Sequence, residues 1–142
     1  MIVLDACAAV EIVRATPVGK GLQQMMLQNE RVVTCCLYRA EVGAVLRKLK
    51  RAAQISQSEA EELMEEAILL IDEFVPIKNL MDEAFRESLR LDHPTYDMHY
   101  FVLARRTAGT LFTLDKGLIN LCADHGVNSI DLVPFPCEHD VE

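Results

Sequence analysis

Residues 2–5 read Ile2-Val3-Leu4-Asp5, three apolar residues that lead directly into an aspartate. A similar arrangement returns late in the sequence as Leu111-Phe112-Thr113-Leu114-Asp115. Short apolar runs of this kind are typical of buried β-strands. We therefore expect two strands that each end at a carboxylate.

Further apolar runs alternate with stretches whose apolar residues recur at spacings of three and four, which predicts helices. Ser56 and Glu59 match the capping box of a helix N-terminus, and Thr95 is expected to cap another helix. Strands separated by helices indicate an α/β fold with a mostly parallel sheet covered on both faces. The predicted strands are 2–4, 31–34, 74–77, 111–114 and, with a weaker pattern, 129–133; the predicted helices are 38–53, 59–72, 80–91 and 96–108.

The positions of the two strand-end aspartates have functional consequences. In parallel α/β sheets the carboxyl ends of the strands lie at one edge, and ligands bind there. Asp5 and Asp115 should emerge at this edge. Aspartate is also a favoured N-cap of a following helix, so capping alone is the simpler explanation for either residue taken singly.

Composition places the chain among soluble globular proteins, with 142 residues of which 51% are hydrophobic and 25% charged. This is enough for one domain, which we place at residues 1–134 and follow with a flexible C-terminal tail at 135–142. No apolar run approaches the roughly 20 residues that cross a bilayer, and we see no signal peptide. Five cysteines without a C-x-x-C pair suit reduced thiols, so we expect a cytoplasmic protein.

Acidic residues outnumber basic ones, 22 against 14, and the net charge of −8 disfavours non-specific binding to duplex nucleic acid. Two of these acids stand on apolar helix faces. Glu41 lies between Leu37 and Val45 at four-residue spacing, and Asp97 heads a stripe that includes Tyr100. A partly buried carboxylate without a partner is costly, unless the helix rotates that residue to the rim.

If these two helices face the sheet edge that carries Asp5 and Asp115, four carboxylates converge. Like charges this close stay ionised only beside a counter-charge, and a divalent metal supplies one. Oxygen ligands suit Mg²⁺, with Mn²⁺ as a substitute, whereas the lack of a paired His/Cys set argues against zinc.

Four segments together resemble the PIN-domain nucleases, and most closely the VapC-type toxins of toxin–antitoxin pairs. Each segment is weak alone, but the order of the four acids and the length of the chain fit the family. The segments are Ile2-Val3-Leu4-Asp5, Tyr38-Arg39-Ala40-Glu41-Val42, Tyr96-Asp97-Met98-His99-Tyr100-Phe101-Val102-Leu103-Ala104 and Thr113-Leu114-Asp115-Lys116-Gly117-Leu118.

The resemblance implies a three-layer α/β/α PIN-like fold and a Mg²⁺-dependent endoribonuclease that hydrolyses RNA phosphodiester bonds, as the toxin component of a type II toxin–antitoxin system. It also implies an RNA substrate, a cognate antitoxin protein that occupies the site, and a homodimer. Residue by residue, the acidic cluster that binds metal and acts in catalysis matches Asp5, Glu41, Asp97 and Asp115. Thr113 matches the hydroxyl residue found two positions before the last acid. We expect Asp5 and Asp97 to be the direct metal ligands.

One departure from the family pattern keeps an alternative open. Ser, Thr or Asn commonly stands two residues after the first aspartate, and here Cys7 holds that place. A thiol is a weaker hydrogen-bond donor, so the chain could instead be a catalytically impaired PIN-like domain that binds RNA or protein. A phosphohydrolase or response-regulator-like domain is a further alternative, although Asp5 is not followed by the D-x-D pattern of aspartyl-phosphate phosphatases.

Several further residues have weaker functional signals. Thr113, Lys48 and Lys116 lie near the acids and are weak candidates for substrate binding; as phosphate contacts the two lysines rank low, because basic residues on helices are most often solvated. His93 and His99 flank Asp97, and for both we expect a capping or surface role. Leu22, Met25 and Met26 at helical spacing are expected to be core or subunit interface. The run Cys137-Glu138-His139-Asp140 is expected to be frayed and without function.

Overall fold

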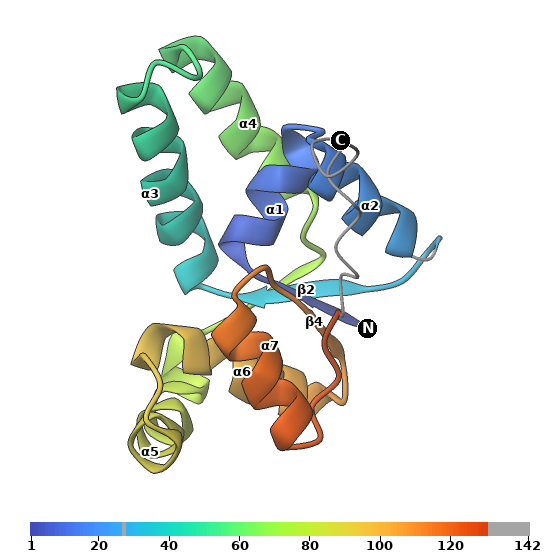
Figure 1. The fold of residues 1–142 in the computed structure, drawn as a ribbon, viewed down its shortest axis with the longest axis vertical. Coiled ribbons are helices and arrows are strands. Elements are labelled where there is room, and N and C mark those ends of the chain that lie inside the picture. The colour runs from blue at the N-terminus through green and yellow to red at the C-terminus, as the bar shows by residue number, and fades with distance from the viewer. Residues whose placement is uncertain (27, 131–142) are drawn as a thin grey trace, which may run out of the picture.

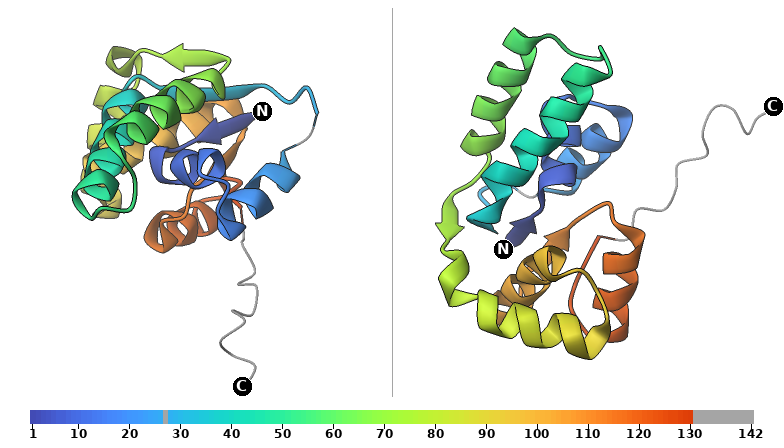
Figure 2. Two further views of the ribbon diagram at one scale, coloured as in Figure 1. Left: turned by 90° about the horizontal axis from the view of Figure 1, so that it is seen from above. Right: turned by 90° about the vertical axis from the view of Figure 1, so that its left-hand side faces the viewer.

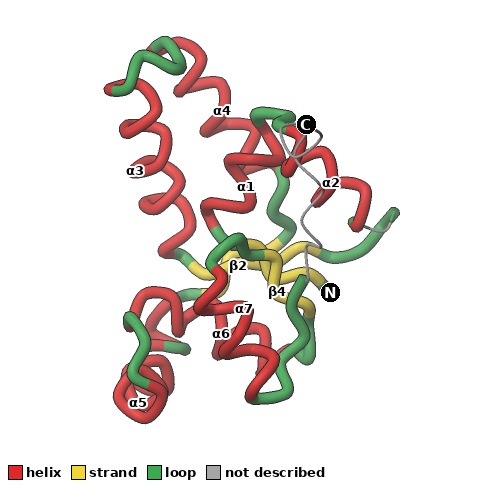
Figure 3. Tube along the Cα trace, viewed as in Figure 1, coloured by secondary structure: helices red, strands yellow, loops and turns green. Residues whose placement is uncertain are grey.

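Four short strands form one parallel sheet in the computed structural model, which describes residues 1–26 and 28–130 (Figure 3). The strand order is β3-β2-β1-β4. Ile2 of β1 pairs with Val32 of β2 on one side and with Thr110 of β4 on the other. The strands are β1 (Ile2–Leu4), β2 (Val32–Cys35), β3 (Glu73–Val75) and β4 (Thr110–Phe112).

Helices cover both faces of this sheet, as Figures 1 and 2 show. One layer contains α1 (Ala6–Val13), α2 (Pro17–Met25), α3 (Leu37–Arg51) and α4 (Gln57–Leu69). The other contains α5 (Met81–Leu91), α6 (Thr95–Thr107) and α7 (Lys116–Asp124), with a short 3₁₀ turn at Ile77–Asn79 before α5. The expected three-layer α/β/α arrangement with a parallel sheet is therefore confirmed.

The strand residues divide between two apolar cores. Ile2 and Leu4 pack among the helices of the first layer, whereas Val3 packs against those of the second. This alternation is the two-residue period of a strand whose two faces are both covered. In the second layer, all seven residues from Met98 to Ala104 are buried, so α6 is a central helix rather than an amphipathic surface helix. It therefore gives Asp97, in its first turn, a fixed position.

The predicted elements agree with the structure in type and differ at their ends. The capping box at Ser56 is confirmed, because its hydroxyl accepts from the Glu59 backbone while the Glu59 carboxylate accepts from the Ser56 backbone. The prediction for Thr95 is wrong. Thr95 is the first residue of α6 behind Pro94, and its hydroxyl contacts Ser88 Oγ at 2.9 Å instead of a backbone N–H.

The predicted strand at 129–133 and the tail at 135–142 lie partly or wholly outside the described residues. In the described part of the predicted fifth strand, Ser129 forms a single parallel bridge to Leu111. Among the helices that the structure describes, none combines the length and apolar character needed to span a bilayer.

The topology marks one edge of the sheet as a binding site. From β1 the chain adds β2 and β3 on one side, and β4 is added on the opposite side of β1. Such a reversal of strand order opens a crevice beyond the carboxyl ends of the two neighbouring strands. Here these are β1, which ends just before Asp5, and β4, which is followed by Thr113.

Candidate active site

A cavity of about 260 Å³ opens at the carboxyl edge of the sheet, and the four predicted acids line it. They come from four separate segments and lie at or near the N-termini of α1, α3, α6 and α7. Helix N-termini favour negative charge. The lining residues are Asp5, Ala6, Cys7, Glu41, Asp97, Tyr100, Leu114 and Asp115.

Asp5 is the deepest of the four acids, at 9% exposure. It caps α1, and its Oδ1 accepts a hydrogen bond from the Ala8 backbone N–H at 2.9 Å. The pKa of this carboxyl is raised to about 6: burial raises it most, hydrogen bonds from Thr113 and Ala8 partly offset the rise, and the negative charges of Glu41 and Asp97 add to it. Asp5 therefore has an environment that disfavours its own charge.

Asp115 caps α7 in the same way, with Oδ1 accepting from the Leu118 backbone N–H at 3.1 Å. Thr113 is fully buried beneath it, and its hydroxyl accepts from the Asp115 backbone N–H at 3.2 Å. Thr113 thus ties together the two segments that carry Asp5 and Asp115. Both strand-end aspartates act as caps and also line the cavity, so the two explanations for them coexist.

Glu41 reaches the cavity from the second turn of α3 and has a partner on the opposite layer. The Tyr100 hydroxyl donates to its Oε1 at 2.8 Å. Burial raises the pKa of Glu41, the Tyr100 hydrogen bond lowers it, and the charge of Asp97 raises it again. Tyr100 is itself buried, so this hydrogen bond fixes one Glu41 oxygen across the interior.

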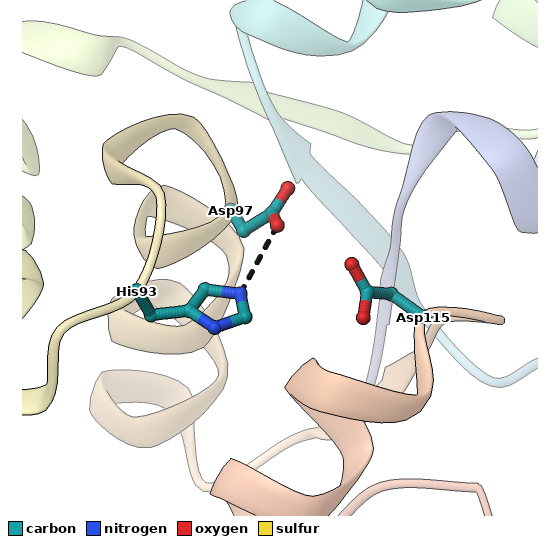
Figure 4. Close-up of side chains that lie close together, drawn as sticks. All are labelled: His93, Asp97 and Asp115. Atoms are coloured by element: carbon teal, nitrogen blue, oxygen red, sulfur yellow. Dashed lines mark hydrogen bonds and ion pairs between the residues drawn. The ribbon is translucent and has the colours of Figure 1, made fainter.

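Asp97 lies in the first turn of α6, where His93 contacts it. The two are joined by a hydrogen bond of 3.1 Å between His93 Nε2 and Asp97 Oδ2 (Figure 4). Burial raises the pKa of Asp97, the His93 hydrogen bond lowers it, and the charge of Asp115 raises it. Among the described residues, one ligand atom each from His93, Asp97 and Asp115 lie within 4.8 Å of one another.

The donor set of this cavity fits a divalent cation. Carboxylate oxygens are the ligands that Mg²⁺ and Mn²⁺ favour. Burial and mutual repulsion raise the pKa values of Asp5, Glu41 and Asp97, and no lysine or arginine lines the cavity within the described residues. A cation would therefore relieve a charge that the described side chains leave uncompensated.

Cys7 lines the same cavity from the first turn of α1. Burial raises the pKa of its thiol to about 11, and the surrounding carboxylates, Asp5 first, raise it too. The thiol therefore stays protonated at neutral pH, where a protonated sulfur is neither a good metal ligand nor a nucleophile.

The basic residues occupy the margins of this region. Lys116 is exposed at the start of α7, next to Asp115, and Lys48 is exposed two turns beyond Glu41 on α3. Neither lines the cavity. Arg105 and Arg106, which also lie on the Asp97 helix, form ion pairs with Glu83 of α5.

Sequence reasoning missed the contacts that Tyr100 and His93 make at the site. Tyr100 was recognised only as part of an apolar stripe, although its three-residue spacing from Asp97 placed it on the same helix face. The surface role expected for the histidines is wrong. The His93 side chain is 14% exposed and contacts Asp97, while His99 is buried and bonds the Thr95 carbonyl at 2.9 Å.

Comparison with known proteins gives a consistent set of relatives. Residues 2–124 match the family model of the PIN domain. Over 134 residues the chain is 32% identical to ribonuclease VapC12 of Mycobacterium tuberculosis, which covers 94% of this chain and 99% of that protein.

Solved structures share the fold. VapC20 of M. tuberculosis, a sarcin-ricin loop cleaving toxin, has a TM-score of 0.65 at 16% identity and covers 85% of this chain and 95% of its own. FitAcB of Neisseria gonorrhoeae gives 0.60 at 18% identity, with 92% and 97% covered. PAE2754 of Pyrobaculum aerophilum gives 0.64 at 20% identity, with 84% and 82% covered.

Proposed function

Because the chain belongs to the PIN domain family and is related over nearly its whole length to a VapC ribonuclease, we propose that it is a Mg²⁺-dependent endoribonuclease and the toxin of a type II toxin–antitoxin pair. The observation that carries this proposal is the convergence of four carboxylates from distant segments in one cavity. We propose that it acts in the cytoplasm, where RNA and a cognate antitoxin would be its partners.

In this proposal the residues of the cavity have separate roles. A bound Mg²⁺, or Mn²⁺ in its place, supplies Lewis acidity at the scissile phosphate and at the attacking water. Asp5 and Asp97 would hold the cation, while Glu41 and Asp115 would complete its surroundings and orient the water. Tyr100 fixes the Glu41 carboxylate through its 2.8 Å hydrogen bond, and Thr113 holds the Asp115 backbone in place.

The test is incubation of the purified protein with total RNA. Cleavage that stops in EDTA and returns with Mg²⁺ or Mn²⁺ supports the proposal. Intact RNA under every metal condition, together with measurable RNA binding, would instead support a binding module.

The binding-module alternative draws on Cys7, which lines the cavity where the family pattern has a hydroxyl or amide. Cys7→Ser restores a stronger donor beside the acids. We expect this variant to bind Mg²⁺ more tightly, by up to about tenfold. Hydrogen-bond partners of metal ligands typically change the metal affinity by such a factor. Calorimetric titration of both proteins measures the change, and equal affinities would remove Cys7 as a reason for weak catalysis.

Lys116 is proposed as a phosphate contact at the rim, with Lys48 as a second and more distant one. We expect Lys116→Ala to weaken RNA binding severalfold and to reduce the slope of log affinity against log salt by about 1, as loss of one phosphate contact does. Binding is measured in EDTA to keep the RNA intact. Lys50→Ala removes the same charge from the end of α3 and should leave the slope unchanged; an unchanged slope for Lys116→Ala contradicts its role.

We further propose that the protein is a homodimer and that α5 forms the contact. Met81, Phe85 and Leu89 recur every four residues and form an apolar stripe that is 47%, 55% and 69% exposed. This helix lies on the outside of its layer (Figure 1). Asp82 and Arg86 flank the stripe, and neither makes an ion pair or hydrogen bond with a residue that the structure describes.

Charge complementarity favours a second copy as the occupant. In a two-fold antiparallel pair the same flank of both helices comes together in opposite directions. Asp82 of one copy then lies towards Arg86 of the other, on both sides of the axis. The apolar stripe would be buried between them.

Phe85→Glu is expected to convert this dimer into a monomer, because it places two like charges at the centre of the interface. Light scattering coupled to size exclusion should then report 16.0 kDa instead of twice that mass. Leu69→Glu, on the exposed face of α4, is the control and should remain dimeric. A parent protein that is monomeric at micromolar concentration contradicts the interface.

A further inference from the structure

An imidazole nitrogen lies in a site whose other predicted ligands are all carboxylate oxygens. His93 Nε2 is 3.1 Å from Asp97 Oδ2, and the ligand atoms of His93, Asp97 and Asp115 lie within 4.8 Å of one another. Figure 4 shows the imidazole and the two carboxylates around one space. Asp5 and Glu41 stand outside this close group.

The position of His93 is built into the turn between α5 and α6. Asp92 ends α5 in the left-handed conformation, at φ 50°, which turns the chain back towards α6. The His93 backbone N–H donates to the Ser88 carbonyl at 3.3 Å, and the Ser88 hydroxyl donates to the His93 carbonyl at 2.7 Å. Both backbone polar groups of His93 are therefore held in place, which fixes the point from which its imidazole extends.

The first turn of α7 lies close to the same imidazole. A Cβ at Gly117 would be 3.2 Å from Asp115 Oδ1 and 3.6 Å from His93 Cε1. Glycine thus leaves room where Asp115 and His93 approach each other from separate segments of the chain. The side chain of His93, at 14% exposure, is also too enclosed to be an ordinary surface histidine.

We propose that His93 Nε2 is a further ligand of the metal at this carboxylate site, on the side formed by Asp97 and Asp115, and that this nitrogen shifts the preference of the site from Mg²⁺ towards first-row transition-metal ions such as Mn²⁺. The inference rests on the metal site of the proposed function. Mg²⁺ is held almost entirely by oxygen, whereas imidazole is a common ligand of transition metals. The rival role is that His93 only orients the Asp97 carboxylate through their hydrogen bond, as partners of metal ligands commonly do.

The two roles differ in what a bound Mn²⁺ senses. Pulsed electron paramagnetic resonance of the Mn²⁺-loaded protein detects nitrogen nuclei bound directly to the ion. We expect an imidazole nitrogen signal that changes frequency when histidine is labelled with ¹⁵N. It should vanish in His93→Gln and persist in His125→Gln, a control on an exposed histidine.

Affinity gives a second readout. His93→Gln is expected to weaken Mn²⁺ binding by on the order of tenfold, and to change Mg²⁺ binding less, so that the ratio of the two affinities falls. Mn²⁺ that binds the parent without a nitrogen signal overturns the role of His93 and leaves the carboxylate site standing. A parent that binds no Mn²⁺ overturns the metal site of the proposed function as well.

Discussion

Asp97→Asn is expected to reduce RNA cleavage by roughly a thousandfold or more, equivalent to about 4 kcal/mol of transition-state stabilisation. Asn keeps the size of the side chain and can still accept the 3.1 Å hydrogen bond from His93. It removes the negative charge that would hold the cation. The fold should persist, because Asp97 contributes no cap hydrogen bond to α6.

The measurement compares initial rates of RNA cleavage for the parent and the variant at saturating Mg²⁺. Asp124→Asn, at the far end of α7 and exposed, removes one charge away from the cavity and should cleave at the parent rate. Circular dichroism of both variants verifies that they are folded. If Asp97→Asn retains the parent rate, the carboxylate cluster is not the source of the activity.

Asp5→Asn is expected to stabilise the metal-free protein. Its free energy of unfolding should rise by up to about 3 kcal/mol at pH 8. Asp5 is buried, and its pKa is raised from 3.8 to about 6. Each pKa unit corresponds to about 1.4 kcal/mol. Asn carries no charge to bury and caps helices about as well as Asp, so the bond from the Ala8 N–H is retained.

The sign of the pH dependence follows from the direction of this shift. A carboxyl whose pKa is higher in the folded chain binds its proton more readily there, so the folded state gains stability as the pH falls. The cost of ionising Asp5 develops as the pH rises from about 4 to about 6 and is complete above that range. The advantage of Asp5→Asn should therefore be below about 1 kcal/mol at pH 4.

Urea unfolding in EDTA at pH 4 and pH 8 measures this difference. Asp124→Asn serves as the reference for loss of an exposed charge and should show no comparable gain at pH 8. A destabilised Asp5→Asn protein at pH 8 would mean that its carboxylate is held by favourable contacts rather than disfavoured by burial.

Much of the fold could be predicted from local sequence because its strands are short apolar runs and its longer helices have clear spacing. Helix α1 was not predicted. Ala6, Ala8, Ala9, Val10 and Ile12 are all buried, because α2, α3 and α4 surround this helix. An element covered on most sides lacks the contrast between apolar and polar faces that marks an amphipathic helix.

The acids of the site could be predicted for a similar reason: Asp5 and Asp115 follow strands whose carboxyl ends meet at one edge. The roles of His93 and Tyr100 could not. Contact between His93 and Asp97 depends on the left-handed turn at Asp92, and the Tyr100 hydroxyl meets Glu41 across 59 residues of sequence. Neither geometry is contained in the spacing of residues along one helix.

Convergence of the carboxylates on a divalent cation is tested most directly by anomalous diffraction from crystals of the protein soaked in Mn²⁺. We predict an anomalous peak in the cavity at the carboxyl edge of the sheet, within coordination distance of Asp97 and at least one other of the four acids. A peak elsewhere on the molecule, or crystals in which these carboxylates are paired with lysine or arginine and bind no Mn²⁺, would contradict this prediction.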